Sequence, residues 1–192
     1  MIHLIYVKNI ISRTVGGTFQ ELSFAVRVRN VGFGKQVEVH WAGENGVWQV
    51  TPAEFRSELP DGEEVWVAET AIPLTRQSAI PGNIQFAARL THDGISHWDS
   101  RQGQNYTLDA DSGIVVLEPV DMRVVGCRPR LAPGMVALPI EVAVRSAVGP
   151  EAVTVHWTTD GWATQHATQA HYRRDHWDRT VGSNARNPNR YG

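Results

Sequence analysis

The chain has 192 residues, of which 42% are hydrophobic and 20% are charged, a composition typical of a globular protein with one large or two small domains. The formal net charge of −2 provides no strong field for nucleic acid or an anionic membrane, so we expect neither as a partner. The sequence contains no run of about 18 apolar residues and therefore predicts no membrane-spanning helix.

Apolar and polar residues alternate in short runs along the chain, and the spacing typical of amphipathic helices is hard to find. The first segment, Met1–Lys8, has neither the basic leader nor the cleavage site of a signal peptide; it predicts a strand, and we expect a cytoplasmic protein. The next alternating runs, in chain order, are Leu22–Val28, Val37–Trp41, Val65–Val67 and Ile84–Leu90. A period of two, with Gly, Pro and Asn turns between the runs, predicts an all-β, antiparallel β-sandwich.

The later part of the chain repeats the pattern of these early strands. Phe24–Trp41 aligns with Ile140–Trp157 without a gap, and both segments end in Val-x-Val-His-Trp. Trp48 matches Trp162 after a two-residue deletion. Alternation alone does not require the shared His-Trp pair or the second Trp, so we interpret the pattern as a duplication.

The polar segment Asp109–Gly113 predicts the boundary between the two copies. We expect one domain at 1–110 and a second, truncated copy at 114–192. A partial sandwich leaves open strand edges and an uncovered apolar face. Either another chain completes the second copy or the natural protein continues.

Motifs for catalysis and metal binding are weak. The acidic segment 54–64 predicts a solvated turn, and no nucleophile motif such as Gly-x-Ser-x-Gly occurs, so we predict no catalytic residues. His166, His171 and His176 stand five residues apart and cannot share one helix face, so we predict no metal site and no cofactor. The only cysteine, Cys127, excludes an internal disulfide and is expected to be a small buried residue.

Tryptophan is over-represented, with seven residues, several of them beside turns. The apolar face of a sugar ring stacks on indole or phenol rings, while nearby amides and carboxylates bind hydroxyl groups. The densest cluster of such groups is His97–Tyr106, although its aromatics could also simply cap the sandwich. Trp48 follows a polar turn in a similar way. Trp41 and Trp66 lie inside alternating runs and are expected to pack in the core.

The order of these pieces resembles that of the family 21 carbohydrate-binding modules, the starch- and glycogen-binding domains of glucoamylases and of phosphatase glycogen-targeting subunits. The resemblance spans Leu4 to Leu108. Its pieces are Val28-x-Asn30-x-x-Phe33-x-Lys35-x-Val37-x-Val39, then Trp48, Phe86-Ala87, and Trp98-Asp99-(x)5-Asn105-Tyr106. The resemblance implies an immunoglobulin-like antiparallel sandwich that binds α-1,4-glucans and performs no chemistry.

The resemblance also implies which side chains bind the sugar. Those that match the family's pattern are Lys35, Trp48, Trp98, Asp99, Asn105 and Tyr106. We add Gln104, in the same loop, as a candidate for hydroxyl binding, and Trp162 as a candidate site in the second copy. Ser100 and Arg101 replace two asparagines of the family's segment, which alters part of the polar set.

We therefore expect non-catalytic binding of starch, glycogen or maltooligosaccharides, by aromatic stacking and by hydrogen bonds to hydroxyl groups. An associated enzyme or further domains are the other expected partners. The alternative is a tandem β-sandwich that mediates protein contacts or acts as a spacer without binding sugar. The exposure of Trp48 and Trp98 separates these hypotheses, because a buried ring cannot stack on a sugar.

Overall fold

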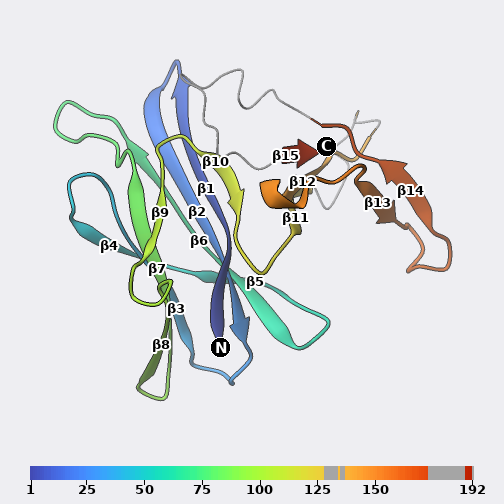
Figure 1. Ribbon diagram of the computed structural model, residues 1–192, viewed down its shortest axis with the longest axis horizontal. Coiled ribbons are helices and arrows are strands. Elements are labelled where there is room, and N and C mark those ends of the chain that lie inside the picture. Colours follow the sequence, from blue (N-terminus) through green and yellow to red (C-terminus); the bar gives the residue numbers. More distant parts are fainter. Residues whose placement is uncertain (128–133, 135–136, 173–188, 192) are drawn as a thin grey trace. The chain divides into compact units, whose positions relative to one another are not determined.

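The computed structural model describes residues 1–127, 134, 137–172 and 189–191, and the chain divides into two compact units (Figure 1). Unit 1 is Met1–Pro119 and unit 2 is Val120–Gly192. The strands of unit 1 are β1 Ile2–Thr14, β2 Gly17–Arg29, β3 Gln36–Ala42, β4 Trp48–Pro52, β5 Glu54–Glu58, β6 Glu63–Pro73, β7 Ile84–His92, β8 Ile95–Asp99, β9 Tyr106–Leu108 and β10 Gly113–Val116. Those of unit 2 are β11 Met122–Cys127, β12 Ile140–Val144, β13 Thr154–Trp157, β14 His166–Gln169 and β15 Asn189–Tyr191, with a short 3-10 helix η1 Ser146–Val148.

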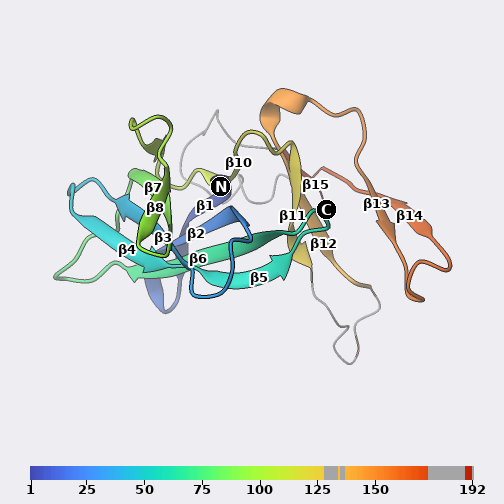
Figure 2. The ribbon, with the colours of Figure 1, turned by 90° about the horizontal axis from the view of Figure 1, so that it is seen from below.

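Unit 1 is an antiparallel β-sandwich, which confirms the predicted all-β class. One sheet, sheet I, has the strand order β10-β1-β2-β6-β5. The other, sheet II, has the order β4-β3-β7-β8. Strand β9 also pairs with β7, at residues 84–86, which precede the residues of β7 that pair with β8. Figures 1 and 2 show β3, β4, β7 and β8 side by side in one layer and β1, β2, β5 and β6 in the other. Each alternating run of the sequence therefore turns its apolar side toward the opposite sheet.

The core of unit 1 lies between these two sheets. Phe24 of β2 and Phe86 of β7 meet there with ring centroids 5.2 Å apart. The aliphatic residues around them are buried completely or almost so: Leu4, Val7, Leu22, Val26, Val28, Val39 and Leu90. Trp41 is 6% exposed and Trp66 packs against the same cluster, as expected from their places inside strands.

Strand β10 places the end of unit 1 later than the polar segment suggested. It pairs with β1 at the edge of sheet I, from Tyr6 opposite Val116 to Asn9 opposite Gly113. The backbone N–H of Leu117 then donates to the carbonyl of Ile5 at 3.0 Å. The apolar run that was expected to open the second domain thus completes sheet I, and unit 1 extends to Pro119.

Unit 2 contains a three-stranded sheet of order β11-β12-β15 and a two-stranded sheet of β13 and β14. Val142, Val144 and Val153 form its buried cluster. Cys127, at the end of the outer strand β11, is exposed, so the prediction of a buried cysteine was wrong.

The pairing of β11 with β12 has the same irregularity as the pairing of β1 with β2. In each, the register shifts by one residue near the start of the first strand, which marks a β-bulge. The pairs that flank the shift are Leu4–Val26 and Tyr6–Ala25 in unit 1, and Val124–Val142 and Gly126–Glu141 in unit 2. Val26 and Val142 are paired by the sequence alignment as well.

Three hydrogen bonds outside the regular ladders occur at equivalent positions within unit 1 and within unit 2. Two of them join backbone groups. The bond from Arg29 N to Met1 O (2.9 Å) in unit 1 corresponds to the bond from Arg145 N to Asp121 O (2.7 Å) in unit 2. The bond from Ala53 N to Val37 O (2.8 Å) corresponds to that from Ala170 N to Val153 O (2.8 Å). In the third, an indole N–H donates to a threonine hydroxyl, Trp41 to Thr51 at 2.9 Å and Trp157 to Thr168 at 3.1 Å. The hairpin β3–β4 and the hairpin β13–β14 therefore share their internal bonding.

The two hairpins differ in how much of their apolar side is covered. Trp41 is 6% exposed, whereas its counterpart Trp157 is 39% exposed and stacks on His166 with centroids 4.4 Å apart.

Of the other two histidines that stand five residues apart in the sequence, His171 is exposed, and His176 lies outside the described residues. In the part of the chain that the structure describes, no helix is long and apolar enough to cross a membrane.

Candidate functional site

The outer face of sheet II carries two of the predicted stacking residues, Trp48 and Trp98. Trp48 opens β4 and lies opposite Ala42 of β3, while Trp98 on β8 lies opposite Arg89 of β7. Directly paired residues share a face, and the partners Ala42 and Arg89 alternate with core residues of their own strands. Both indoles therefore point away from the core. They are 45% and 48% exposed.

Trp98 is held in place by neighbours on the same outer face. His40 of β3 meets its ring edge-on with centroids 4.9 Å apart, and the guanidinium of Arg89 lies 5.4 Å from its centroid. Such contacts fix the ring orientation without covering the whole side chain. The exposed half of the Trp98 side chain is a flat apolar surface, and because the ring is already held in one orientation, little side-chain entropy would be lost when a ligand binds.

Glu38 anchors the two neighbours of Trp98. Its carboxylate accepts hydrogen bonds from Arg89 Nε at 2.9 Å and from Arg89 Nη2, and it lies 3.4 Å from His40 Nε2. Burial raises the pKa of Glu38, but the hydrogen bonds and charge of Arg89 and the contact with His40 outweigh it, so the pKa lies below the ordinary value. Glu38 therefore stays ionised at neutral pH and keeps Arg89 beside the indole.

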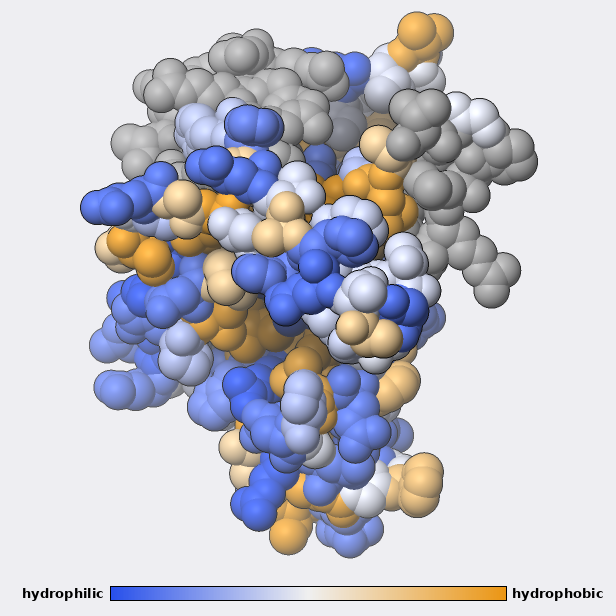
Figure 3. All heavy atoms as spheres, turned by 90° about the vertical axis from the view of Figure 1, so that its right-hand side faces the viewer, coloured by the Kyte–Doolittle hydropathy of each residue, from blue (hydrophilic) through white to orange (hydrophobic). Residues whose placement is uncertain are grey.

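Trp48 lies in an apolar strip at the edge of the same sheet. Val47 and Val50 are 55% and 51% exposed, and Val50 lies opposite His40. Exposure alone marks no site, because hydrophobic side chains interrupt the hydrophilic surface elsewhere too, as Figure 3 shows. What distinguishes Trp48 and Trp98 is that they share one face with only small, aliphatic or polar residues between them.

Strand geometry gives the separation of the two indoles. Three strand spacings of about 4.8 Å lie between β4 and β8, and the register places the two residues four positions, about 13 Å, apart along the strands. The Cα atoms are thus about 20 Å apart along a diagonal. One monosaccharide cannot reach both rings, whereas an oligosaccharide of several units can.

The loop 100–105 follows Trp98 and Asp99 and has an unusual backbone. Arg101, Gln102 and Asn105 have φ angles of 48°, 58° and 59°, and Gly103 lies between them at 86°. Backbone N–H groups of Gly103 and Asn105 donate to the hydroxyl (3.2 Å) and carbonyl (2.8 Å) of Ser100, which closes the loop. Non-glycine residues in this region are strained, and such strain concentrates at functional loops.

The predicted hydroxyl-binding amides are placed on this loop. Gln104 is exposed, and Asn105 is half-buried at the point where the chain enters β9. The loop connects β8 with β9, and both strands pair with β7. Gln104 and Asn105 therefore lie in the connection that follows Trp98, and the structure describes no hydrogen bond of either side chain.

Asp99 and Tyr106 have structural partners in place of the predicted sugar contacts. Asp99 accepts hydrogen bonds from the backbone of Leu4 (2.7 Å) and from the Tyr106 hydroxyl (2.9 Å), so both carboxylate oxygens are engaged. Tyr106 lies opposite Phe86 and stacks on it with centroids 5.6 Å apart. Because Phe86 belongs to the core, the Tyr106 ring faces inward, and Trp98 alone of this pair of aromatics faces outward.

The protonation state of Tyr106 fits this internal role. Partial burial, together with the hydrogen bond to Asp99 and its negative charge, raises the pKa of Tyr106 to about 12, although Arg101 opposes the shift. The phenol therefore remains a donor to Asp99 at any physiological pH. The pair ties β9 to β8 and β1.

Lys35 is likewise committed to the fold. Its ammonium donates to Asn30 Oδ1 (3.1 Å), to the carbonyl of Gly32 (2.9 Å) and to Glu64 (2.9 Å), and the Lys35 side chain is only 7% exposed. An ammonium has three protons, so these three bonds use them all. In this geometry Lys35 closes the β2–β3 turn and offers no donor to a sugar.

In unit 2, Trp162 lies in the β13–β14 turn and is 62% exposed. Its φ angle is 73°, and its backbone N–H donates to the Thr158 hydroxyl at 3.2 Å. Hydrogen bonds from the Thr164 hydroxyl and backbone and from Thr158 lower the pKa of Asp160 to about 2, against a small opposing effect of burial. A fully ionised Asp160 thus holds the turn that presents Trp162.

Sequence reasoning missed the group Glu38, His40 and Arg89 that surrounds Trp98. These residues occupy the polar positions of two alternating runs, which is the signal for an outer face. The sequence does not give strand register, however, and register brings Arg89 opposite both Glu38 and Trp98. The neighbourhood of Trp98 could therefore not be assembled without the fold.

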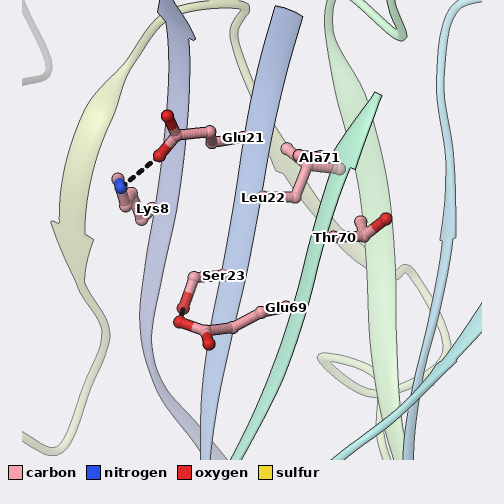
Figure 4. A pocket seen from close by; sticks show the side chains of 7 residues that line it. All are labelled: Lys8, Glu21, Leu22, Ser23, Glu69, Thr70 and Ala71. Atoms are coloured by element: carbon pink, nitrogen blue, oxygen red, sulfur yellow. Dashed lines mark hydrogen bonds and ion pairs between the residues drawn. The ribbon is translucent and has the colours of Figure 1, made fainter. Parts of the chain in front are cut away.

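A pocket of about 360 Å³ lies on the outer face of sheet I, away from the two indoles (Figure 4). It contains two carboxylates, but each has its own partners: Glu21 pairs with Lys8 at 2.5 Å, and Glu69 binds Ser23 and Arg56. No aromatic ring lines it. Among the described residues, no group of three His, Cys, Asp or Glu side chains could hold a metal ion.

No family model and no curated protein sequence matches the chain. Among solved structures it is similar to the starch-binding domain of Rhizopus oryzae glucoamylase in complex with β-cyclodextrin and maltoheptaose, with 16% identity, a TM-score of 0.40, and coverage of 56% of this chain and 95% of that chain. The carbohydrate-binding module of the muscle glycogen-targeting subunit of protein phosphatase-1 has 24% identity, a TM-score of 0.36, and coverage of 54% of this chain and 76% of that chain.

A third similar structure is a cycloalternan-forming enzyme from Listeria monocytogenes in complex with a pentasaccharide substrate. It has 12% identity and a TM-score of 0.36, and the match covers 80% of this chain but only 14% of the enzyme. The first of these structures is a starch-binding domain and the second is a carbohydrate-binding module. Unit 1 has the antiparallel β-sandwich fold that the resemblance of the sequence implies.

Proposed function

We propose that unit 1 binds α-glucan chains on the outer face of sheet II and performs no chemistry. The observation that carries the proposal is the pair Trp48 and Trp98, two half-exposed indoles that point outward from the same sheet about 20 Å apart. A sugar chain laid across the face would stack one unit on each ring. The preference for α-linked glucose rests on the resemblance of the Trp98–Tyr106 segment.

The proposed contacts divide between the two ends of the face. Trp98 is the preorganised end, because His40 and Arg89 fix its ring, and Gln104 and Asn105 in the loop that follows would bind hydroxyl groups. Trp48 is the second stacking point. Each stacked ring contributes about 1 kcal/mol, by analogy with aromatic pairs. A single module then binds in the micromolar to millimolar range.

Compared with the sequence-based expectation, this set omits Lys35, Asp99 and Tyr106 as direct contacts. Their polar atoms are used within the fold, and recruiting them would break hydrogen bonds that are already made. They support the site by holding the strands that present it.

We further infer that unit 2 is a second copy of the same module. The shared β-bulge, the recurring backbone bonds and the common indole–threonine bond support this, since alternation alone demands none of them. Trp162, the counterpart of Trp48, is the candidate for sugar binding there. Two linked weak sites would raise the apparent affinity for a long polysaccharide through effective concentration.

The alternative function is protein binding by the same face. It is favoured by Val47 and Val50, which extend the apolar surface beside Trp48 without offering anything specific to sugar. An associated enzyme, delivered to polysaccharide by this module, is the partner that the glucan-binding function would serve. A cytoplasmic location stays a prediction of the sequence.

The experiment that tests the proposal is a titration followed by intrinsic tryptophan fluorescence. Maltoheptaose and β-cyclodextrin should give saturable changes, and cellohexaose, which has the other linkage, serves as the control. If none of the sugars changes the fluorescence at millimolar concentration, glucan binding is refuted and protein binding becomes the better hypothesis.

A further inference from the structure

Two amide side chains are completely buried in unit 1, and the proposed binding contacts do not use them. Asn9 on β1 and Gln20 on β2 are both 0% exposed. Gln20 Nε2 donates to Asn9 Oδ1 at 2.8 Å, and Asn9 Nδ2 donates to the carbonyl of Asp109 at 2.9 Å. A buried amide pair held by such hydrogen bonds fixes the geometry of whatever it binds.

What Gln20 binds is the loop before β7. Its Nε2 also donates to the carbonyl of Gly82 at 2.7 Å, and its Oε1 accepts from the N–H of Gly82 at 2.8 Å. The side-chain amide thus pairs with both backbone groups of one residue, much as a neighbouring strand would. Gly82 has a φ angle of 70°, which a residue with a side chain rarely adopts.

The loop in turn holds the turn between β3 and β4. The N–H of Glu44 donates to the carbonyl of Pro81 at 2.9 Å, and the Glu44 carboxylate accepts from the N–H of Asn83 at 3.0 Å. The contact is close, because a Cβ on Gly43 would lie 2.7 Å from the carbonyl oxygen of Pro81 and a Cβ on Gly82 would lie 2.5 Å from the Glu44 carboxylate. Gly43 is required for this approach because it meets backbone atoms, and Gly82 is favoured by its positive φ angle.

This turn leads directly into Trp48. The N–H of Gly46 donates to the carbonyl of Gly43 at 3.0 Å, and the N–H of Val47 donates to Asn45 Oδ1 at 3.0 Å. Trp48 is the first residue of β4, which is an edge strand of sheet II paired only with β3 in its sheet order. The docked turn is therefore the second restraint on the position of the indole.

We propose that Gln20 is a positioning residue for Trp48, acting through Gly82 and Glu44. The inference rests on the proposed function, since it assigns Gln20 to the orientation of one of the two stacking rings. The relay starts on sheet I and ends at the edge of sheet II, so the two sheets together set the spacing of the indoles. Without it, Trp48 would be held by the pairing with β3 alone, and the remaining ordering of its side chain on binding would lower the affinity.

The test is a double-mutant cycle in the full chain. Gln20→Met keeps a side chain of similar length but removes the amide, and we expect it to weaken maltoheptaose binding about two- to tenfold, the cost of ordering one side chain. In a Trp48→Ala background, Gln20→Met should weaken binding no further. If its effect is the same in both backgrounds, Gln20 does not act through Trp48 and the proposal fails.

A matched control separates positioning from general stability. Ser23→Ala removes the hydroxyl that donates to Glu69 on the outer face of sheet I, on the same strand as Gln20 but outside the series of hydrogen bonds from Gln20 to Glu44. It should lower the melting temperature without changing affinity, and an equal loss of affinity in both variants would overturn the proposal. If Gln20→Met does not fold, Glu44→Ala removes the next, exposed link and should give the same non-additive loss with Trp48→Ala.

A readout without ligand keeps the inference distinct from the proposed function. In protein labelled with 5-fluorotryptophan, the fluorine signal of Trp48, assigned by its loss in Trp48→Phe, should shift or broaden in Gln20→Met. The Trp98 signal should not change. An unperturbed Trp48 signal refutes the positioning role even if glucan binds, whereas a perturbed signal in a protein that binds no glucan refutes the proposed function alone.

Discussion

Replacement of Trp98 by alanine should reduce glucan binding while leaving unit 1 folded. The indole is 48% exposed and lies on the outer face, so its removal opens no cavity in the core. The fold loses the edge contact with His40 and the cation–π contact with Arg89. Together these contribute about 1–2 kcal/mol, a modest part of the typical 5–15 kcal/mol stability of a domain.

The loss of binding follows from the same geometry. A stacked ring contributes about 0.5–1.5 kcal/mol beyond its buried area, and the sugar also loses the apolar area that it would cover. Since 1.4 kcal/mol corresponds to a factor of ten, maltoheptaose affinity should fall about tenfold. Trp98→Phe retains a flat ring on the same strand and should lose less.

Isothermal titration calorimetry with maltoheptaose, together with thermal unfolding of each variant, measures both quantities. Undiminished affinity in a folded Trp98→Ala protein would refute the stacking role. A variant that loses binding only because its melting transition falls below the assay temperature would show instead that Trp98 is a structural residue.

Three further outcomes are expected. Trp48→Ala should weaken maltoheptaose binding severalfold but leave maltose binding unchanged, because a disaccharide cannot reach both indoles; equal losses for both sugars would contradict the two-point geometry. Tyr106→Phe should leave affinity intact and destabilise unit 1 by about 1–3 kcal/mol through Asp99, and it should remove a tyrosine ionisation near pH 12 from a 295 nm titration. Because the pKa of Tyr106 is raised to about 12, its contribution to stability is complete below about pH 10 and is lost as the pH rises through about 12. Lys35→Met should cost about 3 kcal/mol, because the buried Glu64 carboxylate loses its ion-pair partner and keeps only the hydrogen bond from the Trp66 indole, and affinity should not change; a changed affinity for sugar would restore Lys35 to the site.

The fold of unit 1 was predictable because its strands alternate strictly. Leu22–Val28 and Ile84–Leu90 present every second side chain to the core, and Phe24 and Phe86 meet there as period two requires. The polar segment 109–113 misled the choice of boundary, since β10 after it returns to pair with β1. Whether a strand joins the preceding or the following sheet depends on long-range pairing, which local sequence does not encode.

The candidate site was only partly predictable. Trp98 and Tyr106 stand in one short motif, yet they face opposite sides of sheet II, because Trp98 pairs with the outward Arg89 of β7 and Tyr106 with the inward Phe86. In the sequence, Lys35 resembles an exposed donor, but in the fold it forms an ion pair with Glu64, which lies nearly thirty residues later in the chain. Residue types thus indicated which side chains mattered, and register determined which of them face the solvent.

Binding on the outer face of sheet II can be observed directly by NMR, by titrating maltoheptaose while the indole N–H signals of the protein are followed. We expect the signals of Trp48 and Trp98 to shift saturably, while those of the core residues Trp41 and Trp66 stay in place. Shifts confined to other residues, or no shift of Trp48 and Trp98 at saturating sugar, would contradict binding on the outer face of sheet II.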